Sequence, residues 1–233
     1  MDSSEGDRKP RAKASKTLDR GLSVLDALAA APGGLSMTAI AAQLGIHRTS
    51  AYRLLGTLCE RRLASVSADG RYHLGVRLLE LAASVAADLR SLAVPELSEL
   101  ANDVGATAFL AVLDGTDAVA VSVIEPRRTR MHVAYRVGSR HPADIGADGL
   151  AILAGRPWRE GERKPVSAAR AAGFASSAGE LQTGAYGIAA PVIRRDRPAE
   201  ASVGVVAMHA LDVAAVAPRV IQAALRVGRA LDW

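Results

Sequence analysis

The 233-residue sequence has little of several things, and each shortage narrows what the protein can be. A single cysteine, Cys59, cannot form an internal disulfide, which fits a reducing compartment. Aromatic residues make up only 3%, so the cores must be built from Ala, Val and Leu. No apolar run approaches the roughly 20 residues of a membrane span, and the first residues are too polar for a secretory signal. We expect a cytoplasmic protein in which Cys59 is a small core residue, the alternative being a redox-sensing thiol.

The sequence also lacks the motifs of common enzymes. There is no G-x-S-x-G nucleophile elbow, no H-E-x-x-H zinc motif and no glycine-rich phosphate loop. Ser139 and His141 would share one face of a strand, but nothing near them in the sequence orients the histidine. The sequence leaves open that His132, His141 and His209 meet in space as a metal site. We expect no catalytic activity, no cofactor and no bound metal.

Excess positive charge is confined to one part of the chain. Residues 1–77 hold 12 Lys and Arg against 7 Asp and Glu, a net charge of +5, whereas residues 78–233 hold 17 of each sign. Residues 1–15 lack hydrophobic periodicity, so we expect a disordered basic tail there. The charge either keeps this tail solvated or neutralises nucleic-acid phosphates, and the two interpretations are compatible.

Residues 36–58, SMTAIAAQLGIHRTSAYRLLGTL, predict two short helices joined by a tight turn. Ser36 can cap the first helix, Ile40 and Leu44 form its apolar stripe, and Gly45 follows where the chain leaves the helix. The second helix is expected to bury Ala51, Leu54, Leu55 and Leu58 and to expose Arg48, Thr49, Tyr52, Arg53 and Gly56. An ordinary helical hairpin with a solvated face would give the same pattern. An outer face of Arg, Thr and Tyr also suits the major groove of DNA.

The segments on either side extend this pair of helices. Residues 63–67 and 72–74 read as short strands around a turn at 68–70, where Asp-Gly is a strong hairpin signal. Upstream, the spacing of Leu18, Leu22, Leu25 and Leu28 predicts one more amphipathic helix. Three helices followed by a hairpin make a winged helix-turn-helix, which favours DNA binding over the ordinary hairpin.

With these elements in place, the chain resembles the IclR family of bacterial transcription regulators. The matching segments are LDRGLSVLDALA, LSMTAIAAQLGIHRTSAYRLLGTL, GRYHLGVRLLEL, SRHPADIGADGLAILA and GIAAPV. The resemblance runs from Lys16 to Trp233 and is strongest in the first third. It implies a winged helix-turn-helix DNA-binding domain at 16–77, a linker helix at 78–91 and a GAF-like effector-binding and oligomerisation domain at 92–233. It also implies a homodimer or a dimer of dimers.

The resemblance further assigns the DNA contacts, which in the family lie at the start of the second motif helix and on the wing. The corresponding residues here are His47, Arg48, Thr49, Ser50, Tyr52, Arg53 and Arg71. Arg48 and Arg53 are the best candidates to contact guanine edges or phosphates, because a guanidinium group can donate hydrogen bonds to both.

Beyond the wing the sequence predicts an α+β fold. An apolar helical stripe runs from Leu78 to Leu89, and another helix at 92–104 follows. Alternating patterns predict strands at 107–113, 118–124, 131–137, 188–193 and 202–208, with helices at 145–153 and 213–231. Mixed strands with helices at both ends indicate a domain around a central antiparallel sheet, like the GAF-like domain of the family.

In the family, a small molecule binds inside this second domain. The corresponding positions here are Ala147, Asp148, Ser177, Gly187, Val206 and Met208. Members that bind small organic acids offer backbone N–H groups at the helix start and polar side chains on the strands. Here Val206 and Met208 are apolar, and Asp148 would repel a carboxylate unless an arginine or a proton intervened. We expect a neutral, more apolar small-molecule effector, not a simple carboxylate, or no effector at all.

Residues 156–165 are charged and contain helix breakers, so we expect a loop where the family has a longer stretch with an additional helix. Such a short cover would leave the pocket open or filled by Trp158. The sequence therefore predicts a sequence-specific DNA-binding regulator whose operator binding is modulated by oligomerisation and by an effector. The alternative is a ligand-independent DNA-binding protein whose second domain serves only assembly.

Overall fold

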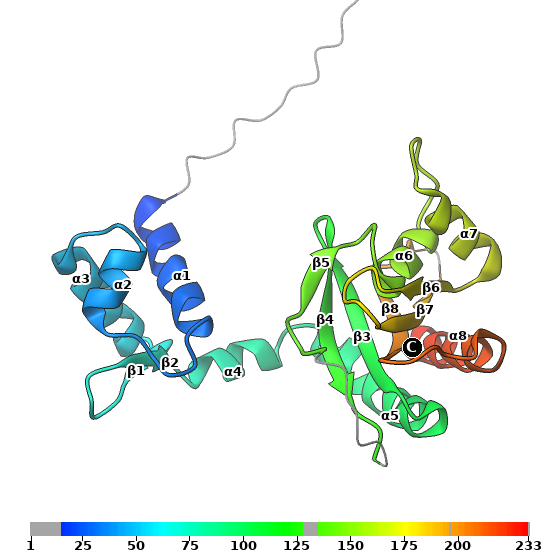
Figure 1. Cartoon of the computed structure of the whole chain (residues 1–233), viewed down its shortest axis with the longest axis horizontal. Coiled ribbons are helices and arrows are strands. Elements are labelled where there is room, and N and C mark those ends of the chain that lie inside the picture. The colour runs from blue at the N-terminus through cyan, green and yellow to red at the C-terminus, as the bar shows by residue number, and fades with distance from the viewer. Residues whose placement is uncertain (1–14, 128–134, 196, 233) are drawn as a thin grey trace, which may run out of the picture. The chain divides into compact units, whose positions relative to one another are not determined.

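The computed structural model describes residues 15–127, 135–195 and 197–232 (Figure 1). The chain divides into two units, Met1–Val85 and Ala86–Trp233. Within the described ranges, every helix is too short or too polar to cross a lipid bilayer.

The first unit is a winged helix-turn-helix. Its elements are α1 (Lys16–Ala29), α2 (Met37–Gln43), α3 (Arg48–Glu60), β1 (Ala64–Val66), β2 (Tyr72–Leu74) and α4 (Arg77–Ala83). Its core is built from aliphatic side chains of the three leading helices and the hairpin, namely Val24, Leu28, Ile40, Leu55, Leu58 and Ala64. Each of the first three helices thus buries one stripe against the other two.

The turn between α2 and α3 is as predicted. The hydroxyl of Ser36 accepts a hydrogen bond from the Ala39 backbone N–H at 3.2 Å and caps α2. Gly45 adopts φ of +62°, a left-handed conformation in which a side chain would be strained. This glycine lets the chain leave α2 and begin α3 with only four residues between the two helices.

Helix α1 turns a different face to the core from the one predicted. Leu18 and Leu22 are 63% and 53% exposed, whereas Gly21, Val24 and Leu28 are buried. A Cβ placed on Gly21 would lie 3.9 Å from Leu54 Cδ2, so the small residue faces α3. Part of the predicted leucine stripe is therefore left on the surface.

The hairpin forms at the predicted place, with strands of three residues each. Ala64 pairs with Leu74 and Val66 with Tyr72 in an antiparallel register. Tyr72 also pairs with Leu35, and the two residues exchange backbone hydrogen bonds of 3.0 and 2.8 Å. This extra pairing attaches the hairpin to the segment that leads into α2.

The predicted continuous helix from Leu78 to Leu89 is wrong. Helix α4 ends at Ala83, and Ala86 has φ of +47°, outside the helical region; α5 (Ala87–Val104) then begins earlier than the predicted residue 92. Most helix stability in proteins comes from packing of an apolar face, and α4 buries none of its residues. An apolar stripe without a packing partner in the same chain did not keep the helix continuous.

The second unit consists of one sheet with helices on both faces. Besides α5, its elements are β3 (Thr107–Asp114), β4 (Asp117–Ile124), β5 (Arg140–Pro142), α6 (Ala147–Ala154), α7 (Lys164–Ala172), β6 (Ala175–Ala178), β7 (Tyr186–Pro191), β8 (Ala201–Ala207) and α8 (Val213–Ala230). The six strands are antiparallel in the order β5-β4-β3-β8-β7-β6. Figure 1 shows α5 and α8 on one side of this sheet and α6 and α7 on the other.

Alternate residues of the central strands enter two separate cores. On β3, Leu110 packs with the side chains of α5 and α8, whereas Phe109 packs with those of α6 and α7. Because successive side chains of a strand point to opposite faces, both faces of the sheet are apolar and buried. This α+β arrangement confirms the predicted fold class.

Two predictions for this unit are not confirmed by the structure. The predicted strand at 131–137 lies largely outside the described residues. The expected absence of a further helix after α6 is wrong, because α7 follows a loop that ends at Arg163. Pro165, interpreted as a helix breaker, stands in the first turn of α7, where proline is well tolerated. Trp158 is exposed and is not among the described residues that line the cavity of this unit.

Candidate nucleic-acid interface and ligand cavity

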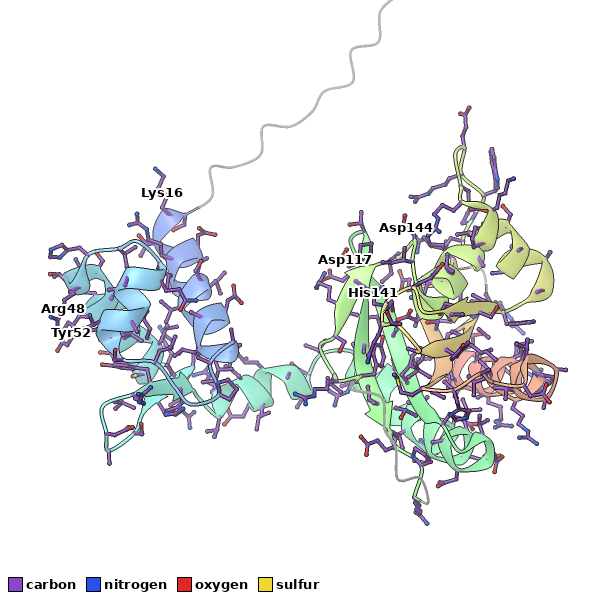
Figure 2. All side chains as sticks on the ribbon, viewed as in Figure 1. Lys16, Arg48, Tyr52, Asp117, His141 and Asp144 are labelled. Carbon is purple, nitrogen blue, oxygen red and sulfur yellow. The ribbon has the colours of Figure 1, made fainter. Side chains whose placement is uncertain are left out.

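The outer face of α3 presents the predicted DNA-contacting side chains. His47, Arg48, Thr49, Tyr52 and Arg53 are exposed, and Ser50 is half-buried. Figure 2 shows Arg48 and Tyr52 on the same outer side of the unit, and Tyr52 is 65% exposed. The opposite face of α3 is fixed in the core by Ala51, Leu55 and Leu58. A rigid helix therefore holds a polar face towards solvent.

The start of α3 is suited to an anion. His47 caps the helix, with Nδ1 3.4 Å from the Thr49 backbone nitrogen and 3.2 Å from Thr49 Oγ1. The first turn of α3 contains no acidic residue. Because helix N-termini carry a partial positive charge, this end adds to the charge of the arginines beside it.

Arg48 and Arg53 are unpaired in the part of the chain that the structure describes. None of the ion pairs found there involves either side chain. Their guanidinium groups are therefore available to phosphates or to base edges in a groove.

Arg71 on the hairpin is partly engaged within its own unit. It donates a hydrogen bond of 3.1 Å to the Gly34 carbonyl, and its Nε lies 3.5 Å from Asp69 Oδ2. Hydrogen bonds from Ser67 and the Arg71 backbone lower the pKa of Asp69. A guanidinium has five N–H donors, so these contacts leave donors for a phosphate.

A cavity of about 60 Å³ lies in the second unit, between the start of α6 and the sheet. Five of the six positions assigned by resemblance line it: Ala147, Asp148, Ser177, Gly187 and Val206, but not Met208. The other lining residues are Phe109, Tyr135, Glu180, Leu181, Gln182 and Ala185. Its volume is well below the roughly 300–1000 Å³ of pockets that enclose larger ligands. As it stands, the cavity has room for only a few non-hydrogen atoms.

Asp148 is a buried carboxylate with two side-chain partners. Tyr135 donates its hydroxyl proton to Asp148 Oδ2 at 2.8 Å, and His141 Nε2 lies 2.9 Å from the same oxygen. The side chains of His141 and Asp148 are only 9% and 4% exposed. Tyr135 also packs edge-on against Phe109 of β3, with 5.2 Å between ring centroids. The negative charge in the cavity wall is therefore compensated within the protein.

His141 makes two contacts that require a protonated ring. Its Nδ1 lies 3.0 Å from the Pro142 carbonyl oxygen, and its Nε2 faces the Asp148 carboxylate. Both partners only accept hydrogen bonds, so the ring satisfies both when it carries two N–H groups. Burial opposes the charged ring, but the hydrogen bond to Asp148 and its negative charge outweigh burial and raise the pKa of His141. Burial and Asp148 also raise the pKa of Tyr135, which stays a donor.

Replacement of His141 by glutamine should remove stability in a pH-dependent way. Because the folded-state pKa of His141 lies above the ordinary value of 6.5, its contribution is complete below pH 6.5 and is lost as the pH rises through the folded pKa. Urea denaturation of both proteins from about pH 5 to about pH 9 measures this difference. A difference that stays constant over the range contradicts a protonated ring.

The start of α6 is capped by residues distant in sequence. The N-cap residue, Gly146, has φ of +79° and no side chain with which to cap the helix. Instead, the Gly146 N–H donates to Glu180 Oε2 at 2.7 Å and the Ala147 N–H donates to Ser177 Oγ at 3.1 Å. Strand β6 and the segment after it therefore satisfy two donors that a helix start leaves free.

Three of these residues were missed or misjudged from the sequence. Tyr135 and Glu180 carried no signal, because neither belongs to a recognised motif. The sequence places no orienting partner beside His141. The structure supplies this partner, Asp148, which lies seven residues away on α6, while β5 places His141 opposite Ala118 of β4.

The histidines considered for a metal site and the single cysteine form no further functional site among the described residues. No group of three His, Cys, Asp or Glu side chains within the described ranges is arranged to hold a metal, and His132 lies outside those ranges. Cys59 is half-buried against the core of the first unit, and burial raises its pKa. A raised pKa disfavours the reactive thiolate, so the core interpretation of Cys59 holds better than redox sensing.

Comparisons with known proteins agree with this architecture. The family described as the IclR helix-turn-helix domain matches residues 17–66, and the family described as the C-terminal part of bacterial IclR regulators matches residues 81–164. The glycerol operon regulatory protein of Streptomyces griseus is 31% identical over 214 residues, which are 82% of this chain and 84% of that protein. The regulator KipR of Bacillus subtilis is 26% identical over 94% of this chain and 98% of its own.

Solved structures show the same fold. An IclR homolog from Microbacterium hydrocarbonoxydans, crystallised with 4-hydroxybenzoate, matches with a TM-score of 0.80 at 22% identity, over 93% of this chain and 99% of that chain. An IclR regulator from Alicyclobacillus acidocaldarius has a TM-score of 0.77 at 23% identity, with the same coverage of both chains. Because the Streptomyces relative exceeds 30% identity over most of both sequences, and both family segments occur in the expected order, the chain belongs to the IclR family of bacterial transcription regulators.

Proposed function

We propose that this protein binds operator DNA as a dimer through the outer face of α3, and that a small molecule in the cavity of the second unit modulates this binding. One observation carries the first part of the proposal: an exposed helix face with no acidic residue in its first turn and with two arginines that are unpaired among the described residues. A protein of this kind would act in the cytoplasm, where bacterial DNA lies.

The residues of this face have different roles in the proposed complex. Arg48 and Arg53 bond guanine edges or phosphates, and each bidentate pair with a guanine contributes about 1–3 kcal/mol of discrimination. His47, Thr49, Ser50 and Tyr52 position the helix through phosphate contacts, which fix its register in the groove. Arg71 lies on the wing and contacts the DNA backbone beside the major groove.

Apolar side chains exposed on α1 and α4 support a dimer. Leu79 of α4 is 74% exposed, and Leu81 of the same helix is exposed as well. Val85, just after α4, and Leu18 and Leu22 of α1 are also exposed. Exposed apolar side chains that form one patch mark a contact surface, and the seven-residue helix α4 carries two such side chains, Leu79 and Leu81. A second copy of the chain would cover them and would present a second α3 to a second half-site.

Replacement of Leu79 by glutamate is expected to shift the protein towards the monomer and to weaken operator binding at least about tenfold, because a half-site alone makes fewer contacts. Since Leu79 is exposed within the chain, the folded monomer should keep its stability. Analytical ultracentrifugation and operator titration measure the two effects. Val137→Glu changes an exposed valine of the second unit and is the matched control. An unchanged dimer in the Leu79 variant would exclude α4 from the interface.

The effector part of the proposal depends on the cavity. One related structure is a complex with 4-hydroxybenzoate, which supports a small-molecule site in this fold, and another relative is named as a glycerol operon regulatory protein. The cavity of this chain has a volume of only about 60 Å³, and its charges are internally paired, which favours a small neutral ligand. The competing function is an assembly module without a ligand. A thermal-shift screen of small neutral compounds separates them, because a true effector stabilises the fold that it binds.

The DNA part is tested by footprinting on the protein's own promoter region. A dimer is expected to protect two half-sites whose centres lie about 10 base pairs, or a multiple of this, apart on one face of the duplex. Uniform weak protection along the fragment would contradict operator recognition.

A further inference from the structure

A carboxylate of the protein itself occupies the start of α6. Glu180 Oε2 accepts the Gly146 N–H at 2.7 Å, and the two residues are 34 positions apart in sequence. The neighbouring Ala147 N–H is taken by Ser177 Oγ. Helix N-termini attract anions because their N–H groups lack partners inside the helix. At α6 two of these donors, the N–H groups of Gly146 and Ala147, are already used.

The same carboxylate belongs to the wall of the cavity. Glu180, Leu181 and Gln182 line it from the segment that follows β6. This segment rests directly on the helix start, since a Cβ built on Gly146 would lie only 2.7 Å from Leu181 Cδ1. Any ligand that enters the cavity therefore meets Glu180 and the first turn of α6 together.

Charges around the cavity are paired without a ligand. Asp148 is compensated by His141 at 2.9 Å, and Glu180 compensates the partial charge of about +0.5 at the N-terminus of α6. Tyr135, Ser177 and Gln182 are the remaining polar side chains of the lining, and all three are neutral. An incoming carboxylate would find no uncompensated positive group, and it would meet the negative charge of Glu180 at the helix start.

We propose that Glu180 determines the ligand class of this cavity. By holding the Gly146 N–H and placing its negative charge at the start of α6, it excludes carboxylates and restricts the cavity to small neutral ligands. The inference rests on the proposed role of the cavity as the effector site. It differs from repulsion by Asp148, which was expected from the sequence, because Asp148 is neutralised by His141 and remains in place when Glu180 is changed.

The test is a calorimetric titration of the full chain with propionate and propionamide, two ligands of the same shape and different charge. Glu180→Gln keeps the size of the side chain and removes its charge, so propionate should bind at least about tenfold more tightly than to the unaltered protein. The affinity for propionamide should change less than about threefold, because a neutral ligand gains little from the lost charge.

Two further variants locate the effect. Glu160→Gln removes the same charge from an exposed residue outside the cavity and should leave propionate binding as weak as before. Glu180→Gln combined with Ala185→Leu fills the cavity and should lose the gained affinity. Circular dichroism and thermal melting confirm that each variant is folded, which an exposed position such as Glu180 favours.

The inference is overturned if Glu180→Gln binds propionate no better than the unaltered protein, or if Glu160→Gln gains as much. Binding of the unaltered protein to its own promoter DNA is measured on the same samples. If the unaltered protein binds its promoter DNA but Glu180→Gln gains no propionate affinity, only the role of Glu180 is contradicted. If the unaltered protein does not bind its promoter DNA specifically, the proposed regulatory function is contradicted instead.

Discussion

A protein in which Arg48 and Arg53 are both replaced by alanine is expected to bind its operator at least about 100-fold more weakly. Both side chains are exposed on the outer face of α3, and neither is paired with a carboxylate among the described residues. Their loss removes two cationic groups from the helix that we propose to enter the major groove, so discrimination between operator and other DNA should fall together with affinity. Fluorescence anisotropy with a labelled promoter fragment measures both.

The matched control is a protein with Arg136→Ala and Arg159→Ala. Both are exposed arginines of the second unit, so this variant loses the same charge at a distance in sequence from α3. It should keep operator binding within about threefold of the unaltered protein. Equal losses in the two variants would mean that net charge alone, and not the face of α3, determines DNA affinity.

Replacement of Asp148 by alanine has the second large expected effect, on stability. The change leaves the Tyr135 hydroxyl and His141 Nε2 buried without their acceptor, and it leaves the imidazolium without its counter-charge. Breaking a buried, hydrogen-bonded pair in this way should lower the free energy of unfolding by about 2–4 kcal/mol. Urea denaturation at neutral pH measures the difference.

Asp144→Ala is the control for this variant. Asp144 precedes α6, is exposed, and is labelled near His141 in Figure 2. Its loss should change the unfolding free energy by less than about 0.5 kcal/mol. Asp148→Asn should fall between the two, because the amide oxygen still accepts a hydrogen bond while the charge is gone. A loss below about 1 kcal/mol in Asp148→Ala would show that the cluster of Tyr135, His141 and Asp148 is not a stabilising one.

The DNA-binding unit was largely predictable from the sequence, because local rules determine it. A capping serine, a turn glycine with positive φ and an apolar stripe at helical spacing fix α2 and α3 and decide which residues face outwards. Leu18 and Leu22 of α1 escaped these rules. Their spacing is that of a buried stripe, yet the structure exposes them. The spacing predicts an apolar face but does not identify the surface that would cover it.

The cavity was only partly predictable, for a different reason. The resemblance to the family located five of its lining positions, since these lie on α6 and on the central strands. Tyr135, His141 and Glu180 complete it from separate segments, and only the tertiary fold brings them to Asp148 and Gly146. No local pattern encodes such contacts. The expectation that Asp148 acts as a free negative charge is therefore incomplete, because His141 compensates this charge in the folded protein.

Sequence-specific recognition of an operator is the central claim, and one titration tests it most directly. The unaltered full chain is titrated with its own promoter fragment and with a scrambled fragment of the same length and composition, over a series of salt concentrations. At physiological salt the promoter should bind at least about 1000-fold more tightly, and its binding constant should fall linearly with salt on a double-logarithmic scale. Equal affinity for the two fragments at every salt concentration would contradict operator recognition by this protein.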